Sequence, residues 1–244
     1  MRALLLAAAL AAPAAAEEIE TRPPLITTPP EVVERMLSMA GTRAGDLVVD
    51  LGSGDGRIVI AAAQKFGARG LGIELDGALI EKSRAAARAA KVDDKVSFVQ
   101  GDVLAADISR ATVVTVYLLP SLMGRLQARF IAELAPGTRI VSHAFAMAGW
   151  TPDASEVVRL KARHPGQGDE STLHLWIVPA EVRGLWRAPG LSIRIEQNYQ
   201  RIEVQGARAA ALSGRDISWD GFRGRIEGHR IVGELAGRPI ELRR

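Results

Sequence analysis

Up to residue 178, short apolar runs alternate along the chain with segments whose apolar side chains recur at helical spacing. The helical spacing is clearest in residues 31–40, which predict an amphipathic helix covering one side of a sheet. Residues 111–119 are almost wholly apolar, as expected of a central parallel strand that is buried on both faces. This alternation predicts an α/β fold with a doubly wound, Rossmann-like, mostly parallel sheet. The predicted strands are the run that starts at Leu47, then 70–75, 95–100, 111–119 and 138–143, and the predicted helices are 31–40, 58–64, 77–90 and 122–134.

The pattern changes twice toward the C-terminus. Residues 156–162 and 171–178, joined by residues 164–170, predict an antiparallel hairpin that closes the sheet. From residue 181 onward, glycines separate short strand-like runs without helical period, which predicts a small meander or barrel-like all-β module. We therefore expect a domain with an N-terminal arm over residues 17–180, and over residues 181–244 a β-rich lid or interaction module without chemistry of its own. Its predicted strands are 191–196, 201–205, 217–219, 222–226, 231–235 and 239–242.

The first apolar run ends in an acid, Asp50, and glycines follow at every second position, Gly52, Gly54 and Gly56. Glycine is required where the backbone turns sharply at positive φ and where a ligand must approach backbone N–H groups. A dinucleotide-binding fingerprint would have its third glycine one position later, so the NAD spacing is not met. The pattern predicts a nucleotide-like ligand at this first βα turn, and the alternative is an ordinary glycine-rich turn. The candidate binding residues of this glycine turn (residues 50–56) are Asp50, Gly52, Ser53, Gly54, Asp55 and Gly56.

Acids also end the next two predicted strands. Glu74 follows the glycine turn by about two dozen residues, a spacing at which a carboxylate accepts hydrogen bonds from both hydroxyls of a ribose. Asp76 is better placed to cap the helix that follows. Asp102 is placed to accept a hydrogen bond from an adenine amino group, and the alternative is a turn-forming pair with Gly101. Glu74 and Asp102 therefore join the candidate cofactor-binding residues.

Composition narrows the classes of function. The chain has 244 residues, of which 48% are hydrophobic, so it can form one or two globular domains with a sizeable core. The formal net charge is +3, but the basic side chains form no cluster that would follow a phosphate backbone, and we expect no nucleic-acid partner. The absence of cysteine excludes disulfides, thiolate metal sites and thiol nucleophiles, and the histidine spacing suggests no metal site.

Residues 1–16 have the pattern of a secretory signal peptide. A positively charged start precedes an apolar stretch, residues 3–12, that is too short to span a bilayer, and the alanines at 14–16 provide a cleavage site before Glu17. We therefore expect a periplasmic or secreted protein. The alternatives are an uncleaved anchor or a misassigned start codon, which would leave the protein membrane-anchored or cytoplasmic.

Over about residues 25–178, several sequence blocks together resemble one group of proteins. The blocks are Pro29 with Val32 and Val33, DLGSGDGRI at 50–58, Gly72 to Glu74, YLLPS at 117–121, RIVS at 139–142 with Phe145, and Trp150 with Pro152. The glycine turn resembles the first motif of class I S-adenosylmethionine-dependent methyltransferases. The other blocks resemble, within that class, the mitochondrial protein-lysine methyltransferases of the ATP synthase c subunit and the adenine nucleotide translocase. The β-rich module and the signal peptide lie outside the resemblance.

The resemblance implies a cofactor, a substrate and further site residues. The cofactor is S-adenosyl-L-methionine, and the substrate is a lysine side chain of a protein, with membrane proteins among the candidates. Thr28 on the N-terminal arm is expected at the methionine end of the cofactor, and the alternative is that it only starts the turn before the first helix. Tyr117 and Ser121 are the candidate catalytic residues, and His143 is a further candidate partner of the amine; their alternative roles are core aromatic residue, helix N-cap and strand-end polar residue, respectively.

Two other functions remain open at the level of the sequence. One is an exported, non-catalytic binding or scaffold module on a methyltransferase fold, which the signal peptide and the extra β module favour. The other is a methyltransferase that acts on a small molecule. The sequence does not name the methyl acceptor or the oligomeric state.

Overall fold

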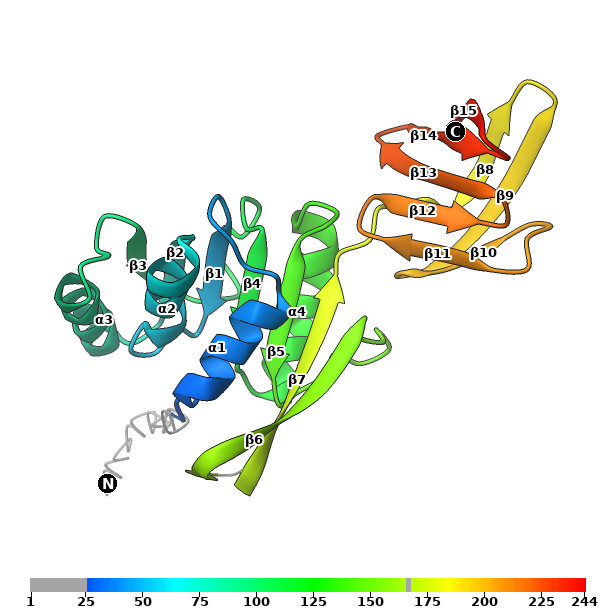
Figure 1. The fold of residues 1–244 in the computed structure, drawn as a ribbon. Helices are drawn as coiled ribbons and strands as arrows, with labels where there is room; N and C mark the ends of the chain where they lie inside the picture. Colours follow the sequence, from blue (N-terminus) through cyan, green and yellow to red (C-terminus); the bar gives the residue numbers. More distant parts are fainter. Residues whose placement is uncertain (1–25, 166–167) are drawn as a thin grey trace, which may run out of the picture.

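The computed structural model of the chain describes residues 26–165 and 168–244, which form two sheets. The N-terminal sheet has seven strands in the order β3-β2-β1-β4-β5-β7-β6, and the C-terminal sheet has eight (Figure 1). The predicted signal peptide lies outside the described residues. None of the helices within the described ranges is long and apolar enough to cross a membrane.

Five parallel strands and an antiparallel pair build the N-terminal sheet. Strands β1 to β5 run parallel, β7 pairs antiparallel with β5, and β6 pairs antiparallel with β7 at the edge. The predicted doubly wound, mostly parallel sheet is therefore confirmed. Its strands are β1 (Leu47–Leu51), β2 (Arg69–Glu74), β3 (Val96–Gln100), β4 (Val113–Val116), β5 (Arg139–His143), β6 (Ala154–His164) and β7 (Gly168–Ile177).

Helices cover both faces of this sheet. Apolar side chains of three helices pack in one cluster against one face, and those of the fourth helix pack against the opposite face. Figure 1 shows the helices on the two sides of the sheet. The first group is α1 (Pro30–Met39), α2 (Arg57–Phe66) and α3 (Gly77–Ala89), and the fourth helix is α4 (Pro120–Glu133). The central strand β4 is buried at every position, as its apolar sequence predicts.

Several predicted boundaries shift for local reasons. Helices α1 and α4 begin at Pro30 and Pro120, earlier than predicted, because proline is tolerated at the first helical position. Strand β4 is shorter than the predicted 111–119, because Tyr117 and its two successors lead into α4 without pairing. The closing hairpin is longer than predicted: β6 continues to His164, which pairs with Gly168. Gly168, the first residue of β7, has φ +79°, a conformation that favours glycine.

The C-terminal sheet is antiparallel, in the order β10-β9-β8-β15-β14-β13-β12-β11, and surrounds its own apolar core. The two end strands of this order, β10 and β11, contact each other without pairing, so the sheet forms an incompletely closed barrel. Two of its strands were not predicted. The apolar run of β8 is short, and β11 is rich in alanine, which has low strand propensity. The strands are β8 (Gly184–Ala188), β9 (Leu191–Asn198), β10 (Arg201–Val204), β11 (Ala210–Ser213), β12 (Asp216–Trp219), β13 (Phe222–Glu227), β14 (Arg230–Leu235) and β15 (Arg238–Arg243).

The turn between β9 and β10 contacts the N-terminal sheet and its helices. The ring of Tyr199 stacks on Trp150 with centroids 5.0 Å apart, and its hydroxyl accepts a 2.9 Å hydrogen bond from Gln127 of α4. Trp150 Nε1 donates to Gln200 Oε1 at 2.8 Å. The β module is thus joined to the α/β part by specific polar and aromatic contacts.

Candidate active site

A small cavity of about 40 Å³ lies at the carboxyl ends of β1 and β4, beside the arm that precedes α1. Most of the residues predicted for the site meet there. The lining includes Thr28, Asp50, Gly52, Ser53, Gly54, Asp55 and Tyr117, together with Ile26, Thr27, Arg57 and Ile58. Gly56, Glu74, Asp102 and Ser121 are not among the lining residues. We refer to residues 26–29 as the arm.

The glycine turn has the backbone that its sequence predicts. Gly52, Gly54 and Gly56 all have positive φ, between +54° and +79°. A Cβ on Gly56 would lie 2.6 Å from the ring of Phe98, and one on Gly52 would lie 2.8 Å from Leu118 Cδ2. The N–H groups of Gly52 and its successor both donate to the carbonyl of Ile73 at 2.9 Å. Glycine is therefore required at these positions by backbone conformation and by close packing.

Asp50 is a buried carboxylate with little compensation for its charge. It is 2% exposed, and Thr115 Oγ1 donates a 2.7 Å hydrogen bond to it. Burial raises the pKa of Asp50 to about 7, with further contributions from the negative charges of Glu74 and Asp55. No ion pair to Asp50 is present among the described residues. The cavity therefore has an anionic wall that a cation would stabilise.

Glu74 is held in place by backbone N–H groups. One of its carboxylate oxygens accepts from Gly54 N at 2.9 Å and the other from Asp76 N at 3.0 Å. These bonds orient the carboxylate at the end of β2, beside the glycine turn. Asp76 accepts from Ala78 N at 2.8 Å and caps α3, as predicted.

Asp102 is exposed and accepts a 2.8 Å hydrogen bond from Leu104 N. This contact is the one expected of a turn-forming acid, the alternative that the sequence left open. Its role toward an adenine amino group stays a prediction.

Arg57 is a site residue that the sequence analysis missed. Its guanidinium pairs with both carboxylate oxygens of Asp55, at 2.7 and 2.9 Å, and donates a 2.8 Å hydrogen bond to the carbonyl of Thr28. The bonds from Arg57 lower the pKa of Asp55 below its usual value. Arg57 thus connects the glycine turn to the arm. In the sequence it stood out only as the residue at the third-glycine position of the NAD fingerprint.

A cluster of polar and aromatic side chains adjoins the cavity on the side of Tyr117. The rings of Tyr117 and His143 have centroids 4.1 Å apart. His143 is fully buried; its Nδ1 lies 3.2 Å from Thr28 Oγ1, and its Nε2 lies 3.0 Å from Ser171 Oγ. The ring of His164 lies 5.7 Å from that of His143. The structure therefore brings Thr28, Tyr117 and His143 together, as the resemblance implies, and adds Ser171 and His164.

Ser121 lies on the surface, outside the small cavity. It is exposed in the first turn of α4, whose N-cap position belongs to Leu119, so the interpretation of Ser121 as an N-cap is wrong. Because it is not among the cavity-lining residues, its predicted catalytic role has no contact on this structure that supports it.

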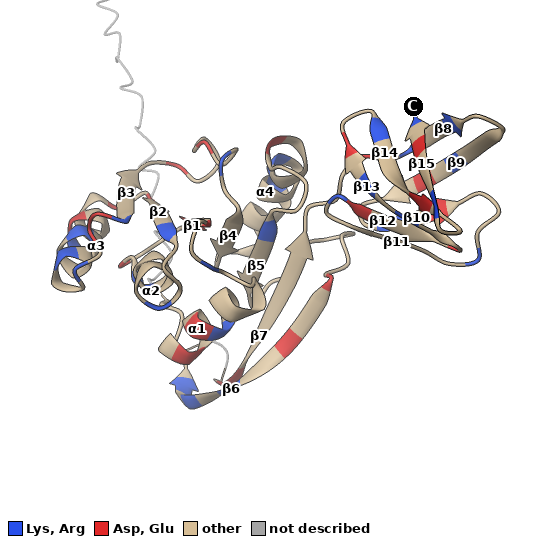
Figure 2. Cartoon of the chain, turned by 45° about the horizontal axis from the view of Figure 1, so that its top comes forward, with Lys and Arg blue, Asp and Glu red and all other residues tan. Residues whose placement is uncertain are grey.

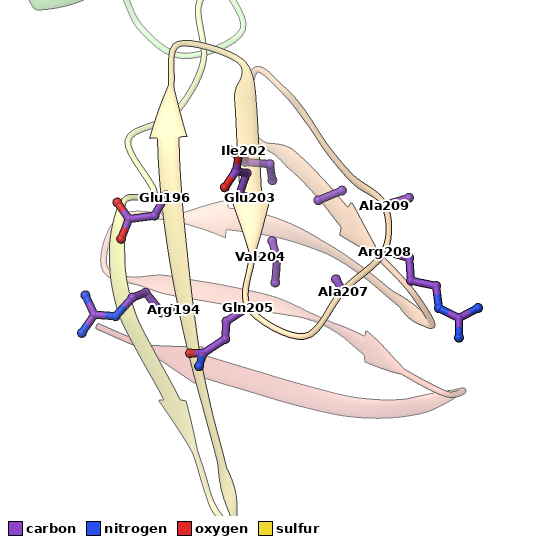
Figure 3. A pocket seen from close by; sticks show the side chains of 10 residues that line it. Arg194, Glu196, Ile202, Glu203, Val204, Gln205, Ala207, Arg208 and Ala209 are labelled. Atoms are coloured by element: carbon purple, nitrogen blue, oxygen red, sulfur yellow. The ribbon is translucent and has the colours of Figure 1, made fainter.

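Larger hollows lie on the β module. One, of about 400 Å³, is bordered by β9, β10 and the segment that leads to β11, and charged side chains such as Arg194 and Glu203 surround it (Figure 3). No group of histidine and carboxylate side chains suited to a metal ion occurs in the described ranges. The small cavity, by contrast, combines a buried carboxylate, a glycine turn and aromatic groups. We therefore place the chemistry of the chain there.

Comparison with known proteins identifies the family. The family model described as the ANTKMT methyltransferase domain matches residues 50–154. A protein-lysine N-methyltransferase of Saccharolobus islandicus is 41% identical over 139 residues, which cover 57% of this chain and 85% of that protein. The chain belongs to the protein-lysine N-methyltransferase family.

Two further proteins are similar to this methyltransferase over part of its length. The lysine N-methyltransferase of the ATP synthase c subunit from Mus musculus is 36% identical over 130 residues, which cover 53% of this chain and 52% of that protein, so the chain spans about half the length of this relative. A crystal structure described as an RNA methyltransferase from Salinibacter ruber, in complex with S-adenosyl-L-homocysteine, is 48% identical, with a TM-score of 0.58. The match covers 64% of this chain and 96% of the chain from Salinibacter ruber. The match to the family model ends at residue 154, before the β module.

The cofactor of this methyltransferase is S-adenosyl-L-methionine, and residues in and beside the small cavity have groups that would bind it. The cavity wall holds the carboxylate of Asp50, whose charge is compensated only in part by the Thr115 hydroxyl, and this carboxylate suits the ammonium group of the methionine part. Ser53 Oγ, also in the lining residues, is buried without a hydrogen-bond partner among the described residues. Glu74 has an oriented carboxylate beside the glycine turn, and its role toward ribose hydroxyls stays a prediction. When bound, the cofactor supplies a methyl group on a sulfonium, which is already an activated leaving group.

Proposed function

We propose that this methyltransferase methylates a lysine side chain of a protein. The observation that carries the proposal is the wall formed by Tyr117 and Thr28, which lies next to the anionic part of the cofactor cavity and has the buried ring of His143 packed behind it. An aromatic and hydroxyl-bearing wall suits the aliphatic stem and the amine of a lysine. The names of the relatives from Saccharolobus islandicus and Mus musculus support the same acceptor.

The main task of the protein is to present a neutral amine to the methyl group. A lysine amine has an unperturbed pKa of about 10.4 and must lose a proton before it can act as a nucleophile. Burial in a partly apolar channel lowers the pKa of an amine, because it disfavours the charged form. Tyr117 lines the cavity, Leu118 follows it in the chain, and both are half-buried, so they provide such surroundings. Holding the amine in line with the methyl group then supplies much of the acceleration.

The experiment follows the methyl group into its acceptor. The full chain is incubated with isotopically labelled S-adenosylmethionine and separated fractions of cell protein, total RNA and small metabolites. We expect label in protein, on lysine residues identified by mass spectrometry of peptides. Asp50→Asn abolishes the labelling, and the matched variant Asp216→Asn on β12 leaves it unchanged. Label that enters only RNA or only the small-molecule fraction contradicts the proposal.

RNA is the second candidate acceptor, because the structure from Salinibacter ruber is named an RNA methyltransferase and is 48% identical. RNA binding requires a continuous basic surface that follows phosphates. Figure 2 shows Lys and Arg interspersed with Asp and Glu on both sheets of the described chain, which favours a protein acceptor.

We also propose that the chain is exported after cleavage before Glu17, on the strength of the residue pattern at positions 1–16. The mass of the mature protein tests this, together with fractionation of the cells that make it. A chain that begins at Glu17 outside the cytoplasm supports export. An intact chain in the cytoplasm or at the membrane contradicts it.

A further inference from the structure

Three side chains from distant parts of the sequence hold the arm against the cofactor cavity. His164 Nε2 lies 2.9 Å from the carbonyl oxygen of Thr27, and Arg57 donates to the carbonyl oxygen of Thr28 at 2.8 Å. His143 contacts the hydroxyl of the same Thr28 at 3.2 Å. Both threonines line the cavity, so these contacts fix one of its walls.

The carbonyl partner determines which nitrogen of His164 carries a proton. A carbonyl oxygen only accepts hydrogen bonds, so the Nε2 of His164 must be the donor. The other ring nitrogen, Nδ1, is buried without a hydrogen-bond partner among the described residues. A buried, unsatisfied nitrogen costs free energy. One ring nitrogen of His164 is bonded to Thr27 and the other has no partner, so the bond to Thr27 is the polar contact that this side chain makes among the described residues.

The same strand is bound to α1 at two further points. The backbone N–H of Lys161 donates to Glu31 at 2.9 Å, and Arg35 forms an ion pair with Glu156. Residues 164, 161 and 156 of β6 thus meet residues 27, 31 and 35 in order. Strand β6 lies at the edge of the sheet and, through this seam, positions the arm beside the glycine turn of β1 (Figure 1).

We propose that His164 is a positioning residue for the cofactor, because it holds Thr27 and Thr28 as a wall of the cofactor cavity. It acts through the arm. The proposal concerns binding of S-adenosylmethionine and its product S-adenosylhomocysteine, and it does not depend on which group accepts the methyl. A failure of lysine methylation would therefore leave it intact.

The test compares two substitutions at one position in the full chain. His164→Gln keeps an N–H donor at the end of a side chain of similar reach, whereas His164→Ala removes the donor. We expect calorimetry to show that S-adenosylhomocysteine binds about five- to tenfold more weakly to His164→Ala, the size of one lost hydrogen bond, and within about threefold of wild type to His164→Gln. His229→Ala on the β module is the matched control and leaves binding unchanged.

Two further readouts separate positioning from a general loss of folding. Nitrogen-15 NMR of the wild-type imidazole should show the proton on Nε2. Amide hydrogen exchange of residues 27–33 should rise in His164→Ala and stay near wild type in His164→Gln. A proton on Nδ1 in wild type, or unchanged S-adenosylhomocysteine binding in a folded His164→Ala, overturns the proposal. If His164→Ala does not fold, the tautomer and the behaviour of His164→Gln decide it.

Discussion

The hydroxyl of Thr115 on β4 donates a 2.7 Å hydrogen bond to the carboxylate of Asp50 on the neighbouring strand β1. A single hydroxyl donor compensates the desolvation of this buried charge only in part, and the pKa of Asp50 stays raised, at about 7. The cofactor-free protein therefore keeps a carboxylate whose charged form is unfavourable. Asp50 is suited to meet a cation from the cofactor, at a cost to the stability of the free protein.

Asp50 makes the stability of the cofactor-free protein depend on pH. Because its pKa is about 7 when folded and 3.8 as an ordinary value, the folded chain binds more protons than the unfolded chain between these two pH values. The contribution of Asp50 to the free energy of unfolding therefore falls as pH rises through that window, by at most about 4 kcal/mol. Asp50→Asn should remove this dependence. Urea denaturation of both proteins at pH 5 and pH 8 should show Asn gaining stability relative to Asp at the higher pH, and equal differences at both pH values would contradict this.

The same titration should control cofactor affinity in the opposite sense. Binding of a cationic ammonium needs the ionised form of Asp50, so affinity for S-adenosylmethionine should fall by up to about tenfold for each pH unit below about 7. Calorimetry between pH 5.5 and pH 8.5 measures the slope. Asp50→Asn should bind weakly at every pH, with the slope removed. A wild-type affinity that is flat across this range would exclude Asp50 as the ammonium partner.

Glu74 should be needed as a carboxylate, because each of its oxygens accepts from a backbone N–H, of Gly54 and of Asp76. In Glu74→Gln one of these N–H groups faces an amide NH₂, and the oriented acceptor for ribose hydroxyls is lost. We expect cofactor affinity to fall by about 10- to 100-fold, as for loss of charged hydrogen bonds. Glu81→Gln on the exposed face of α3 is the matched control and should bind as wild type. Equal affinities of the two variants would refute the role of Glu74.

The glycine turn should not tolerate a side chain at Gly56. Its φ is +79°, and a Cβ there would lie 2.6 Å from the ring of Phe98. Gly56→Ala should lower the free energy of unfolding by about 1–3 kcal/mol or more. Gly101→Ala, where no atom lies within 4 Å of the added Cβ, should be close to neutral. Thermal unfolding of both variants measures the difference, and a neutral Gly56→Ala would show that the turn can relax.

Local patterns predict most of the α/β part, because its strands are buried and its glycine turn needs residues of one type. The sequence also places Asp50 and Glu74 at strand ends, where parallel strands bring their carboxyl ends together. His164 could not be found in this way, since its partner is a backbone carbonyl 137 residues earlier in the chain. Arg57 was missed because its partners, the Asp55 carboxylate and the Thr28 carbonyl, come close to each other only in the folded chain, where the arm crosses the glycine turn. Strand β11 was missed because its alanines indicate no strand.

The contact between Tyr199 and Trp150 has a consequence for how the chain can be divided. Trp150 is 1% exposed, and its ring lies nearly parallel to that of Tyr199, at 7°. Ala180, at the end of the predicted α/β domain, donates its N–H to Gly214 of the β module. A chain cut after residue 180 would uncover the indole face and leave the side chain of Gln127 without its phenolic partner. A shortened enzyme would thus expose an aromatic surface that favours association with other proteins. The β module is therefore best kept in any preparation of this methyltransferase.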